Sequence, residues 1–305
     1  MLAKSSEVSV FLRGGLGNQL FQYSAGLKIS RMTGKKLILR TDLLPIQEDK
    51  IGGISRWPNQ ISEFSHLGYI ETRGNQPPGK TNNLGKFMQL MRMLGDHAPG
   101  LLQNCGVLAN ENRGGREPSS WEKVSLINSY CSFKASALED RDLLSEQILG
   151  VNNPSSDYLI TREQIMNVKP IVVHLRLGDY LGLQGTYGAL SMKYLEQGLD
   201  VLSEKTRRAE RWIFSDSPLE IPMDLLRIIR PSRLLGPSEI PRPIENLALM
   251  SSAAGLICSN SSFSWWGGFL MEDSKTVVAP YFSKASVNNF GPIDTNSGWE
   301  IIDVD

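Results

Sequence analysis

The sequence predicts an α/β fold with largely parallel sheets, and three observations support this prediction. Short apolar runs alternate with longer amphipathic segments along the chain, which is the pattern of consecutive strand–helix units. The chain has 305 residues, a length that suits two domains of roughly 150 residues each. Proline and asparagine cluster in GVNNPSS (residues 150–156), and a fresh set of strands follows. We therefore expect two α/β domains, residues 1–150 and 151–305.

The first strand–helix unit is predicted at the start of the chain. Residues 8–12 form an apolar run typical of a strand. From Asn18 onward, apolar side chains recur at spacings of four, four and three, which predicts one buried helical face. These side chains are Phe21, Ala25, Ile29 and Met32. Gly34 is expected to end this helix, and residues 36–39 to begin another strand.

Two polar segments and four apolar runs complete the prediction. Residues 72–86 and 109–120 are dominated by Gly, Pro, Asn and charged residues, so both are expected to be exposed loops. In the second half, each apolar run ends in small or polar residues, which predicts a second set of strands. The four runs are PIVVHLRLGDY, RWIFSDSP, AGLICSNSSFSWWGGFLM and TVVAPYF.

Charge and composition exclude several classes of function. Lys plus Arg equals Asp plus Glu at 32 each, so no overall field would hold the protein on nucleic acid or an anionic membrane. Cys105, Cys131 and Cys258 lack metal-ligand or disulfide spacing, which favours reduced thiols. The sequence shows no apolar stretch typical of a signal peptide or a membrane span. We expect a cytoplasmic protein that does not insert stably into a membrane.

The first candidate site is the glycine-rich stretch FLRGGLGNQLFQYSAG, residues 11–26. It is not a dinucleotide fingerprint, because Leu20 stands where the last glycine belongs, and it lacks the Lys-Ser/Thr of a P-loop. One interpretation is a tight turn that packs a helix on a sheet. The other is a loop that lets a ligand approach the main chain beside a helix N-terminus. Asn18 and Gln19 favour a polar ligand.

The second candidate site is IVVHLRLGDYL, residues 171–181, where a buried strand runs directly into charged residues. Ligands of open α/β sheets bind at the carboxyl ends of strands. Arg176 offers a planar donor fork suited to phosphate, and Asp179 can hold that fork in position. The alternative is a structural Arg–Asp pair. His174 considered alone would more often be a core histidine.

The third candidate site is LICSNSSFSWWGGFLM, residues 256–271. Hydroxyl groups and unpaired main-chain amides gather where an apolar strand gives way to a helix, which is suited to phosphate. The alternative is an ordinary serine N-cap. Trp265 and Trp266 are expected to be packing residues on either interpretation. Together the three segments predict a cleft between two α/β domains that binds a diphosphate.

In order and in spacing, the three segments resemble the hallmark motifs of the α-1,2-fucosyltransferases of glycosyltransferase family 11. Weaker similarity occurs in YGALSMKYLEQGLDVL and ENLALMSSAAGLI, whereas residues 45–120 show little. The resemblance implies a GT-B-like architecture, with two Rossmann-like domains facing across a cleft. It also implies GDP-L-fucose as donor, inversion at the anomeric carbon, no cofactor or required metal, and a galactose 2-hydroxyl as acceptor in glycan or O-antigen synthesis.

The resemblance also implies roles for individual residues. Arg176 matches the arginine set against the donor diphosphate, and His174 and Asp179 match flanking positions that shape the donor site. Asp179 is also the candidate general base. Further donor-binding positions, expected to contact phosphate through hydroxyls and amides, are Ser261, Ser262 and Phe263. The loop expected to face the reaction centre from the first domain comprises Gly14, Gly15, Gly17, Asn18 and Gln19. Gly15 and Gly17 of this loop are also expected to bind the donor, and an Asn18 network could assist proton transfer.

Four positions depart from the family pattern. Leu177 replaces a common second arginine, Tyr187 a histidine, Ser24 an alanine and Asn246 an aspartate. Two alternatives therefore stay open. One is a fucosyltransferase of another linkage, or a transferase that uses another guanosine diphosphate sugar. The other is a non-catalytic protein that binds a nucleotide sugar or glycan. Residues 45–120 are expected to hold acceptor loops, and transient contact with lipid-linked acceptors at the inner membrane face stays compatible with the sequence.

Overall fold

The computed structural model describes most of the chain. The described residues are 6–51, 54–64, 67–72, 83–110, 118–131, 140–178, 190–206, 209–283 and 298–304. The chain divides into two compact units, Met1–Gln147 and Ile148–Asp305. The division falls just before the GVNNPSS segment. Each unit is built on one parallel sheet.

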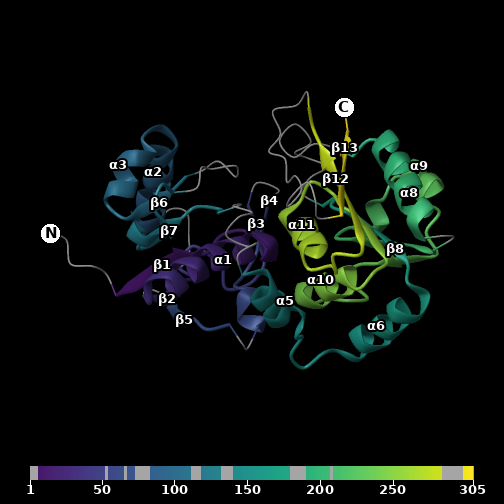
Figure 1. Cartoon of the computed structure of the whole chain (residues 1–305), viewed down its shortest axis with the longest axis horizontal. Helices are drawn as coiled ribbons and strands as arrows, with labels where there is room; N and C mark the ends of the chain where they lie inside the picture. Colours follow the sequence, from purple (N-terminus) through teal and green to yellow (C-terminus); the bar gives the residue numbers. More distant parts are fainter. Residues whose placement is uncertain are drawn as a thin grey trace. The chain divides into compact units, whose positions relative to one another are not determined.

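The sheet of the first unit has five parallel strands in the order β5-β2-β1-β7-β6 (Figure 1). Its strands are β1 (Glu7–Phe11), β2 (Lys36–Arg40), β5 (Ile70–Thr72), β6 (Val107–Ala109) and β7 (Leu126–Asn128). Its helices are α1 (Leu16–Thr33), α2 (Asn83–His97), α3 (Pro99–Asn104) and α5 (Arg141–Leu149), of which α5 runs across the division. β3 (Asp49–Ile51) and β4 (Ile54–Arg56) form a separate antiparallel pair.

Helix α1 follows the predicted start and end closely. Gly34 adopts a left-handed conformation with φ of 70°, and its N–H donates to the Ser30 carbonyl, which ends the helix. Phe21, Ala25 and Ile29 are fully buried, as predicted. Met32 is half exposed, so its assignment to the buried face was wrong. Every residue from 16 to 29 is buried, and Met32 lies in the last turn beyond them.

The loop prediction for residues 72–86 is wrong at its carboxyl end. α2 begins at Asn83, and its first turn occupies residues that the composition assigned to a loop. The helix packs on the sheet through Met88 and Met91, which contact Phe11 and Ala109. Most of the predicted 109–120 loop lies outside the described residues.

The sheet of the second unit has six parallel strands in the order β10-β9-β8-β11-β12-β13. The strands are β8 (Ile171–Leu175), β9 (Arg211–Ser215), β10 (Arg233–Leu235), β11 (Gly255–Ile257), β12 (Thr276–Tyr281) and β13 (Trp299–Asp303). The helices are α6 (Ser156–Val168), α8 (Met192–Thr206), α9 (Met223–Ile229), α10 (Pro243–Ser251) and α11 (Ser262–Phe269). Single-turn 3-10 helices are Ile61–Glu63 and Trp121–Lys123 in the first unit and Pro218–Glu220 in the second.

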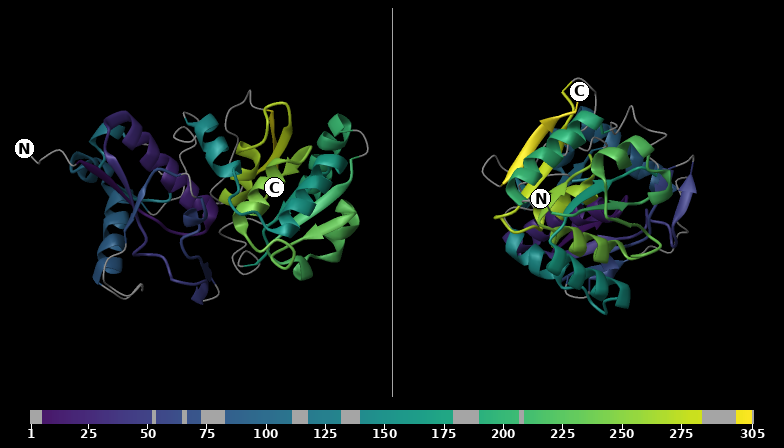
Figure 2. Two further views of the ribbon diagram at one scale, coloured as in Figure 1. Left: turned by 90° about the horizontal axis from the view of Figure 1, so that it is seen from below. Right: turned by 90° about the vertical axis from the view of Figure 1, so that its right-hand side faces the viewer.

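Helices cover both faces of the six-stranded sheet (Figures 1 and 2). Successive residues of β12 point to opposite faces, as in any strand. Val278 joins a buried cluster with α8 and α9, whereas Val277 lies against Gly268 of α11 on the other face. Both faces of the sheet are thus buried, which is why its strands read as continuous apolar runs.

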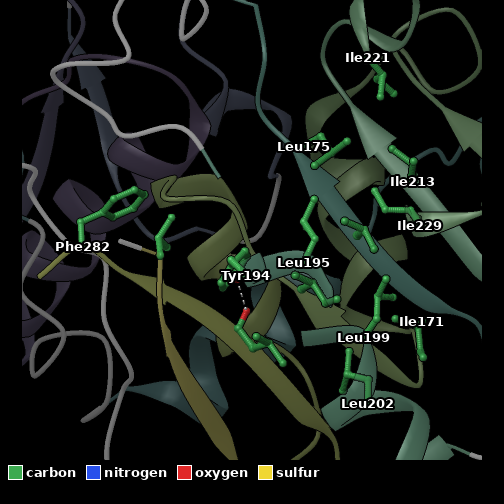
Figure 3. Close-up of a cluster of buried hydrophobic side chains, with 14 residues drawn as sticks. Ile171, Leu175, Tyr194, Leu195, Leu199, Leu202, Ile213, Ile221, Ile229 and Phe282 are labelled. Atoms are coloured by element: carbon green, nitrogen blue, oxygen red, sulfur yellow. Dashed lines mark hydrogen bonds between the residues drawn. The ribbon is translucent and has the colours of Figure 1, made fainter. Parts of the chain in front are cut away.

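A buried hydrophobic cluster of the second unit lies between the sheet and α8. Leu195, Leu199 and Leu202 of α8 pack against Ile171 and Ile213 of the sheet (Figure 3). The buried Tyr194 hydroxyl of this helix lies 2.7 Å from the Cys258 carbonyl oxygen and 3.2 Å from that of Val278, and its single O–H is shared between the two acceptors. These contacts attach α8 to β12 and to the residue that follows β11.

The prediction of an α/β fold with parallel sheets is confirmed in both units. The expected arrangement of the two units across a cleft stays a prediction. Within the part of the chain that the structure describes, no helix is both long enough and apolar enough to span a bilayer.

Candidate functional site

The candidate site of the second unit lies where three neighbouring strands end. In the β8–β9 register Leu175 pairs with Ser215, and in the β8–β11 register Val173 pairs with Ile257. Because the strands are parallel, the residues that follow them emerge at one edge of the sheet. These residues include Arg176, Asp216 and Ser259.

Arg176 is held by Asp216, which the sequence analysis did not select. Arg176 Nη1 lies 3.1 Å from Asp216 Oδ2, and each side chain is about one-fifth exposed, at 19% and 20%. The other carboxylate oxygen, Oδ1, accepts the backbone N–H of Leu177 at 2.8 Å. A Cβ at Gly178 would lie 2.7 Å from Asp216 Oδ2, so a side chain at this position would displace the carboxylate. The arrangement fixes a cation at the sheet edge.

His174 is a buried residue beside this cation. Its Nδ1 lies 2.9 Å from the Ser259 hydroxyl, and its ring packs at a tilt against Phe263, with centroids 5.6 Å apart. Burial, and then the nearby Arg176 guanidinium, lower the pKa of His174 to about 3. The imidazole is therefore neutral and connects β8 to the segment that leads into α11.

The serine segment forms the capped start of α11. The Ser261 hydroxyl accepts the backbone N–H of Phe263 at 3.3 Å and so caps the helix. Ser262 is the first helical residue, and both it and Phe263 are half-buried. The prediction of a serine-rich helix start at a strand end is thus confirmed, and binding of phosphate there stays a prediction.

The tryptophans pack as predicted. Trp265 and Trp266 are buried, and Trp265 stacks on Phe269 with ring centroids 5.1 Å apart. Ser264, on the same helix, accepts the backbone N–H of Ser259 at 3.1 Å through its hydroxyl. These contacts anchor α11 behind Ser262 and Phe263, the half-buried residues of the serine segment.

Three departures from the family pattern have local explanations. Leu177 packs against the hydrophobic cluster between the sheet and α8, so its side chain contributes to the core. Asn246 donates to the carbonyls of Ile240 and Arg242 and holds the loop before α10. Ser24 is buried, and its hydroxyl donates to the Phe21 carbonyl at 3.0 Å.

In the first unit, the glycine-rich stretch joins β1 to α1. Gly14 has φ of 72°, a conformation that glycine adopts without strain. Gly15 is the N-cap of α1, and a Cβ there would lie 3.2 Å from the Trp57 ring. Gln19 Nε2 donates to the carbonyls of Gly14 and Pro58, both at 2.8 Å, and its Oε1 accepts the Gln60 N–H. Gln19 is therefore a structural residue of the loop.

Asn18 lies one residue earlier, in the first turn of α1, and its side chain differs from that of Gln19 in its hydrogen bonding. Asn18 is 9% exposed, and its buried Oδ1 has no hydrogen-bond partner among the residues that the structure describes. An unpaired buried oxygen costs free energy, so such atoms are rare and have a specific cause, such as a functional role or a bound water or ion. Gly17, which precedes Asn18, lies in the same turn.

Two predicted positions fall outside the described residues. Asp179, the candidate general base, is one, and Tyr187 is the other. The residue that sequence reasoning missed is Asp216. Its signal was available, because SDS follows the buried run WIF just as charged residues follow IVVHL.

Within the described residues, no group of three or more His, Cys, Asp or Glu side chains is arranged to hold a metal ion.

The two halves of the second-unit site suit the same chemistry. Arg176 supplies a guanidinium, and α11 supplies a helix N-terminus, and both lie next to His174. Guanidinium groups and helix N-termini both favour phosphate oxygens. The fold and this site are typical of the broad class of α/β proteins that bind phosphorylated ligands, and binding of such a ligand by this chain stays a prediction.

The family of the chain is narrower than this class. Residues 125–290, more than half of the chain, match the family described as Glycosyl transferase family 11. The chain belongs to this family and is a glycosyltransferase.

Two curated relatives from Escherichia coli match almost the whole chain. The O-antigen biosynthesis glycosyltransferase WbnK is 25% identical over 293 residues, which cover 88% of this chain and 92% of the relative. An alpha-1,2-colitosyltransferase is 24% identical over 294 residues, which cover 92% and 94%.

Solved glycosyltransferase structures are similar at lower identity. A glycosyl transferase family 9 protein from Veillonella parvula has a TM-score of 0.49 and 10% identity, with coverage of 99% of this chain and 87% of that one. The fucosyltransferase NodZ from Bradyrhizobium has a TM-score of 0.47 and 12% identity, with coverage of 88% and 94%.

Proposed function

We propose that this glycosyltransferase transfers L-fucose from GDP-L-fucose to the 2-hydroxyl of a galactoside during O-antigen or related glycan synthesis. The observation that carries the proposal is the held guanidinium of Arg176 at the end of β8, next to the capped start of α11. Membership of family 11 supports a sugar nucleotide as the phosphorylated ligand. The two relatives support the pathway and the α-1,2 linkage, since one is named for O-antigen biosynthesis and the other for α-1,2 transfer.

The donor diphosphate would lie against Arg176 and the first turn of α11. The guanidinium would contact phosphate oxygens through its planar fork, and Ser262 and the main-chain amides would contribute further donors. His174, neutral at physiological pH, adds no charge to this site and holds the two elements together.

The reaction would proceed in a single displacement with inversion. The acceptor oxygen forms a bond to the anomeric carbon, while the bond from that carbon to the β-phosphate oxygen breaks and its electron pair leaves with GDP. Negative charge therefore grows on the β-phosphate, where Arg176 would stabilise it. The acceptor proton passes to a base, for which Asp179 stays the candidate, or through water held by Asn18.

The remaining parts of the proposal follow from this chemistry. The site would need no metal, because Arg176 and the α11 N-terminus would neutralise the diphosphate. The enzyme would act in the cytoplasm, in keeping with three free cysteines.

A second candidate donor is favoured by one relative. The alpha-1,2-colitosyltransferase is named for colitose, which is L-fucose without its 3-hydroxyl group. The contacts proposed for phosphate do not read this part of the sugar. Transfer of colitose from its guanosine diphosphate ester is therefore the alternative, with the same linkage and site.

The test measures GDP release in the presence of EDTA. GDP-fucose and GDP-colitose are compared as donors, with lactose and N-acetyllactosamine as acceptors, and NMR determines the linkage of any product. We expect an α-1,2-linked fucosyl product that forms without metal. A product with colitose alone would favour the second donor, and wild-type protein that neither binds GDP nor releases it would overturn the proposal.

Arg176 variants test the site itself. Arg176→Ala is expected to lower kcat on the order of 10²–10³-fold, as expected when a preorganised donor to the transition state is removed. Arg176→Lys should fail similarly, because an ammonium lacks the planar fork. Circular dichroism checks that both variants are folded. Activity of Arg176→Ala within a few-fold of wild type would show that the diphosphate is bound elsewhere.

A further inference from the structure

We propose that Asp216 is a positioning residue that sets the orientation of Arg176 for the donor diphosphate. This inference rests on the proposed function and extends it to a residue that touches Arg176 and not the reacting atoms. Both oxygens of the Asp216 carboxylate are engaged, one by Arg176 Nη1 at 3.1 Å and the other by the Leu177 N–H at 2.8 Å.

The sheet register explains why this residue controls Arg176. Leu175 and Ser215 are paired at the ends of β8 and β9. Arg176 follows β8 and Asp216 follows β9, so the two residues are neighbours at the edge of the sheet. The carboxylate therefore binds both the side chain of Arg176 and the main-chain N–H of the next residue. The absence of a side chain at Gly178 leaves space for the carboxylate in this position. Two points of attachment fix a direction, whereas one would fix only a distance.

The sign of the charge separates positioning from simple attraction. A carboxylate near a diphosphate repels it, so removal of that charge would strengthen anion binding if orientation played no part. If Asp216 instead holds the guanidinium in its binding geometry, removal of the charge weakens binding, because the fork no longer faces the phosphate oxygens. The two explanations predict opposite changes in GDP affinity.

The variants Asp216→Asn and Asp216→Ala separate the two attachments. Asparagine retains a carbonyl oxygen for the Leu177 N–H but carries no charge for Arg176, whereas alanine removes both. We expect Asp216→Asn to raise the Kd for GDP, measured by calorimetry, and to lower kcat/KM about 10- to 100-fold. Asp216→Ala is expected to lose at least as much. Asp216→Asn should unfold in urea at a concentration close to that of the wild type.

A double-mutant cycle with Arg176→Ala tests whether Asp216 acts through the arginine. In this background Asp216→Asn should cause no further loss of GDP affinity, and the removed repulsion should give a small gain. A purely structural residue would cost the same in both backgrounds. The cycle uses GDP binding as its readout, so it does not require turnover.

A matched control is available in α9. Asp224 forms an exposed ion pair with Arg227, with Asp224 Oδ1 and Arg227 Nη1 3.0 Å apart. Asp224→Asn breaks an Arg–Asp pair outside the site and should leave GDP affinity and kcat/KM unchanged.

The outcomes separate this inference from the proposed function. Wild-type protein that binds no GDP would overturn the proposed function, and the inference with it. Wild-type protein that binds GDP, with Asp216→Asn binding it equally or more tightly, would overturn only the role of Asp216. An equal loss of affinity in the presence and absence of Arg176 would also overturn that role.

Discussion

At the level of single residues, the charge state of His174 connects the site to stability. The imidazole is buried between the Ser259 hydroxyl and the Phe263 ring, and burial lowers its pKa to about 3. In the unfolded chain the ordinary value is about 6.5. Between these values the unfolded state binds one proton more than the folded state. Above about pH 6.5 the free energy of unfolding therefore does not depend on this proton. Below that value the free energy of unfolding decreases as the pH falls toward 3.

His174→Gln is expected to reduce this acid sensitivity. Urea unfolding at pH 7.5 and pH 5 measures it, and each pH unit in the window costs up to about 1.4 kcal/mol of wild-type stability for one proton. The variant should lose less stability than the wild type between these two pH values. His97→Gln, at an exposed position on α2, is the control and should behave as the wild type does. Equal losses in wild type and His174→Gln would contradict the prediction.

Residue types alone predicted part of the site. The position of Arg176 after an apolar run made it a candidate, and the sizes of Trp265 and Trp266 made them packing residues. Asn18 and Gln19 carry the same amide group, however, and only the fold distinguishes them. Gln19 has three hydrogen bonds to the main chain, whereas Asn18 Oδ1 has none within the described part of the chain. Partners distant in sequence, such as Pro58, are not visible in a local motif.

At the level of elements, the close approach of α2 to β6 depends on one glycine. A Cβ on Gly95 would lie 1.6 Å from the Ala109 carbonyl oxygen, which belongs to strand backbone. Backbone cannot rotate away as a side chain can, so a methyl group would separate the helix from the sheet. The helix also contributes Met88 and Met91 to this contact.

Gly95→Ala is therefore expected to destabilise the protein by about 2 kcal/mol or more, through overpacking. Gly100→Ala in α3 is the matched control, because a Cβ there would meet no atom within 4 Å. That change should be neutral or stabilising by up to about 1 kcal/mol, since alanine favours a helix. Urea denaturation of the two variants measures the difference. Similar stabilities would contradict the proposed contact.

The beginning of α2 shows what the sequence did not predict at this level. Residues 72–86 are polar as a block, which favoured a loop, yet a helix starts within them at Asn83. Several apolar side chains of the helix are exposed, and so the pattern of the first turns does not mark a buried face clearly. These side chains are Phe87, Leu90, Met93 and Leu94. Clearer local signals mark two other helices: Ser261 caps the start of α11, and Gly34 ends α1.

At the level of the whole molecule, strand–helix alternation predicted parallel sheets, but it did not predict strand order. The order β10-β9-β8-β11-β12-β13 places β9 beside β8, and this neighbourhood brings Asp216 to Arg176. β13 was not among the apolar runs selected, since only Trp299 of its residues is buried. The pairing of strands that are distant in sequence therefore determines which residue binds Arg176, and local sequence patterns do not contain this information.

The proposed donor site makes a prediction for the protein as a whole. The chain consists of two compact units, and every residue proposed to bind the diphosphate belongs to Ile148–Asp305. GDP at about 100 times its Kd would stabilise the state that binds it by about 2.7 kcal/mol. Hydrogen exchange with and without GDP should therefore show slower exchange at the ends of β8 and β9 and in the first turn of α11.

The same experiment provides its own comparison in the other unit. β1 and the first turn of α1 should exchange at unchanged rates with GDP alone, because GDP carries neither the transferred sugar nor the acceptor. Arg176→Ala, at the same GDP concentration as wild type, should lose most of the protection, since fewer molecules are then occupied. Protection of α1 in place of β8 and α11 would instead assign the nucleotide to the glycine-rich loop.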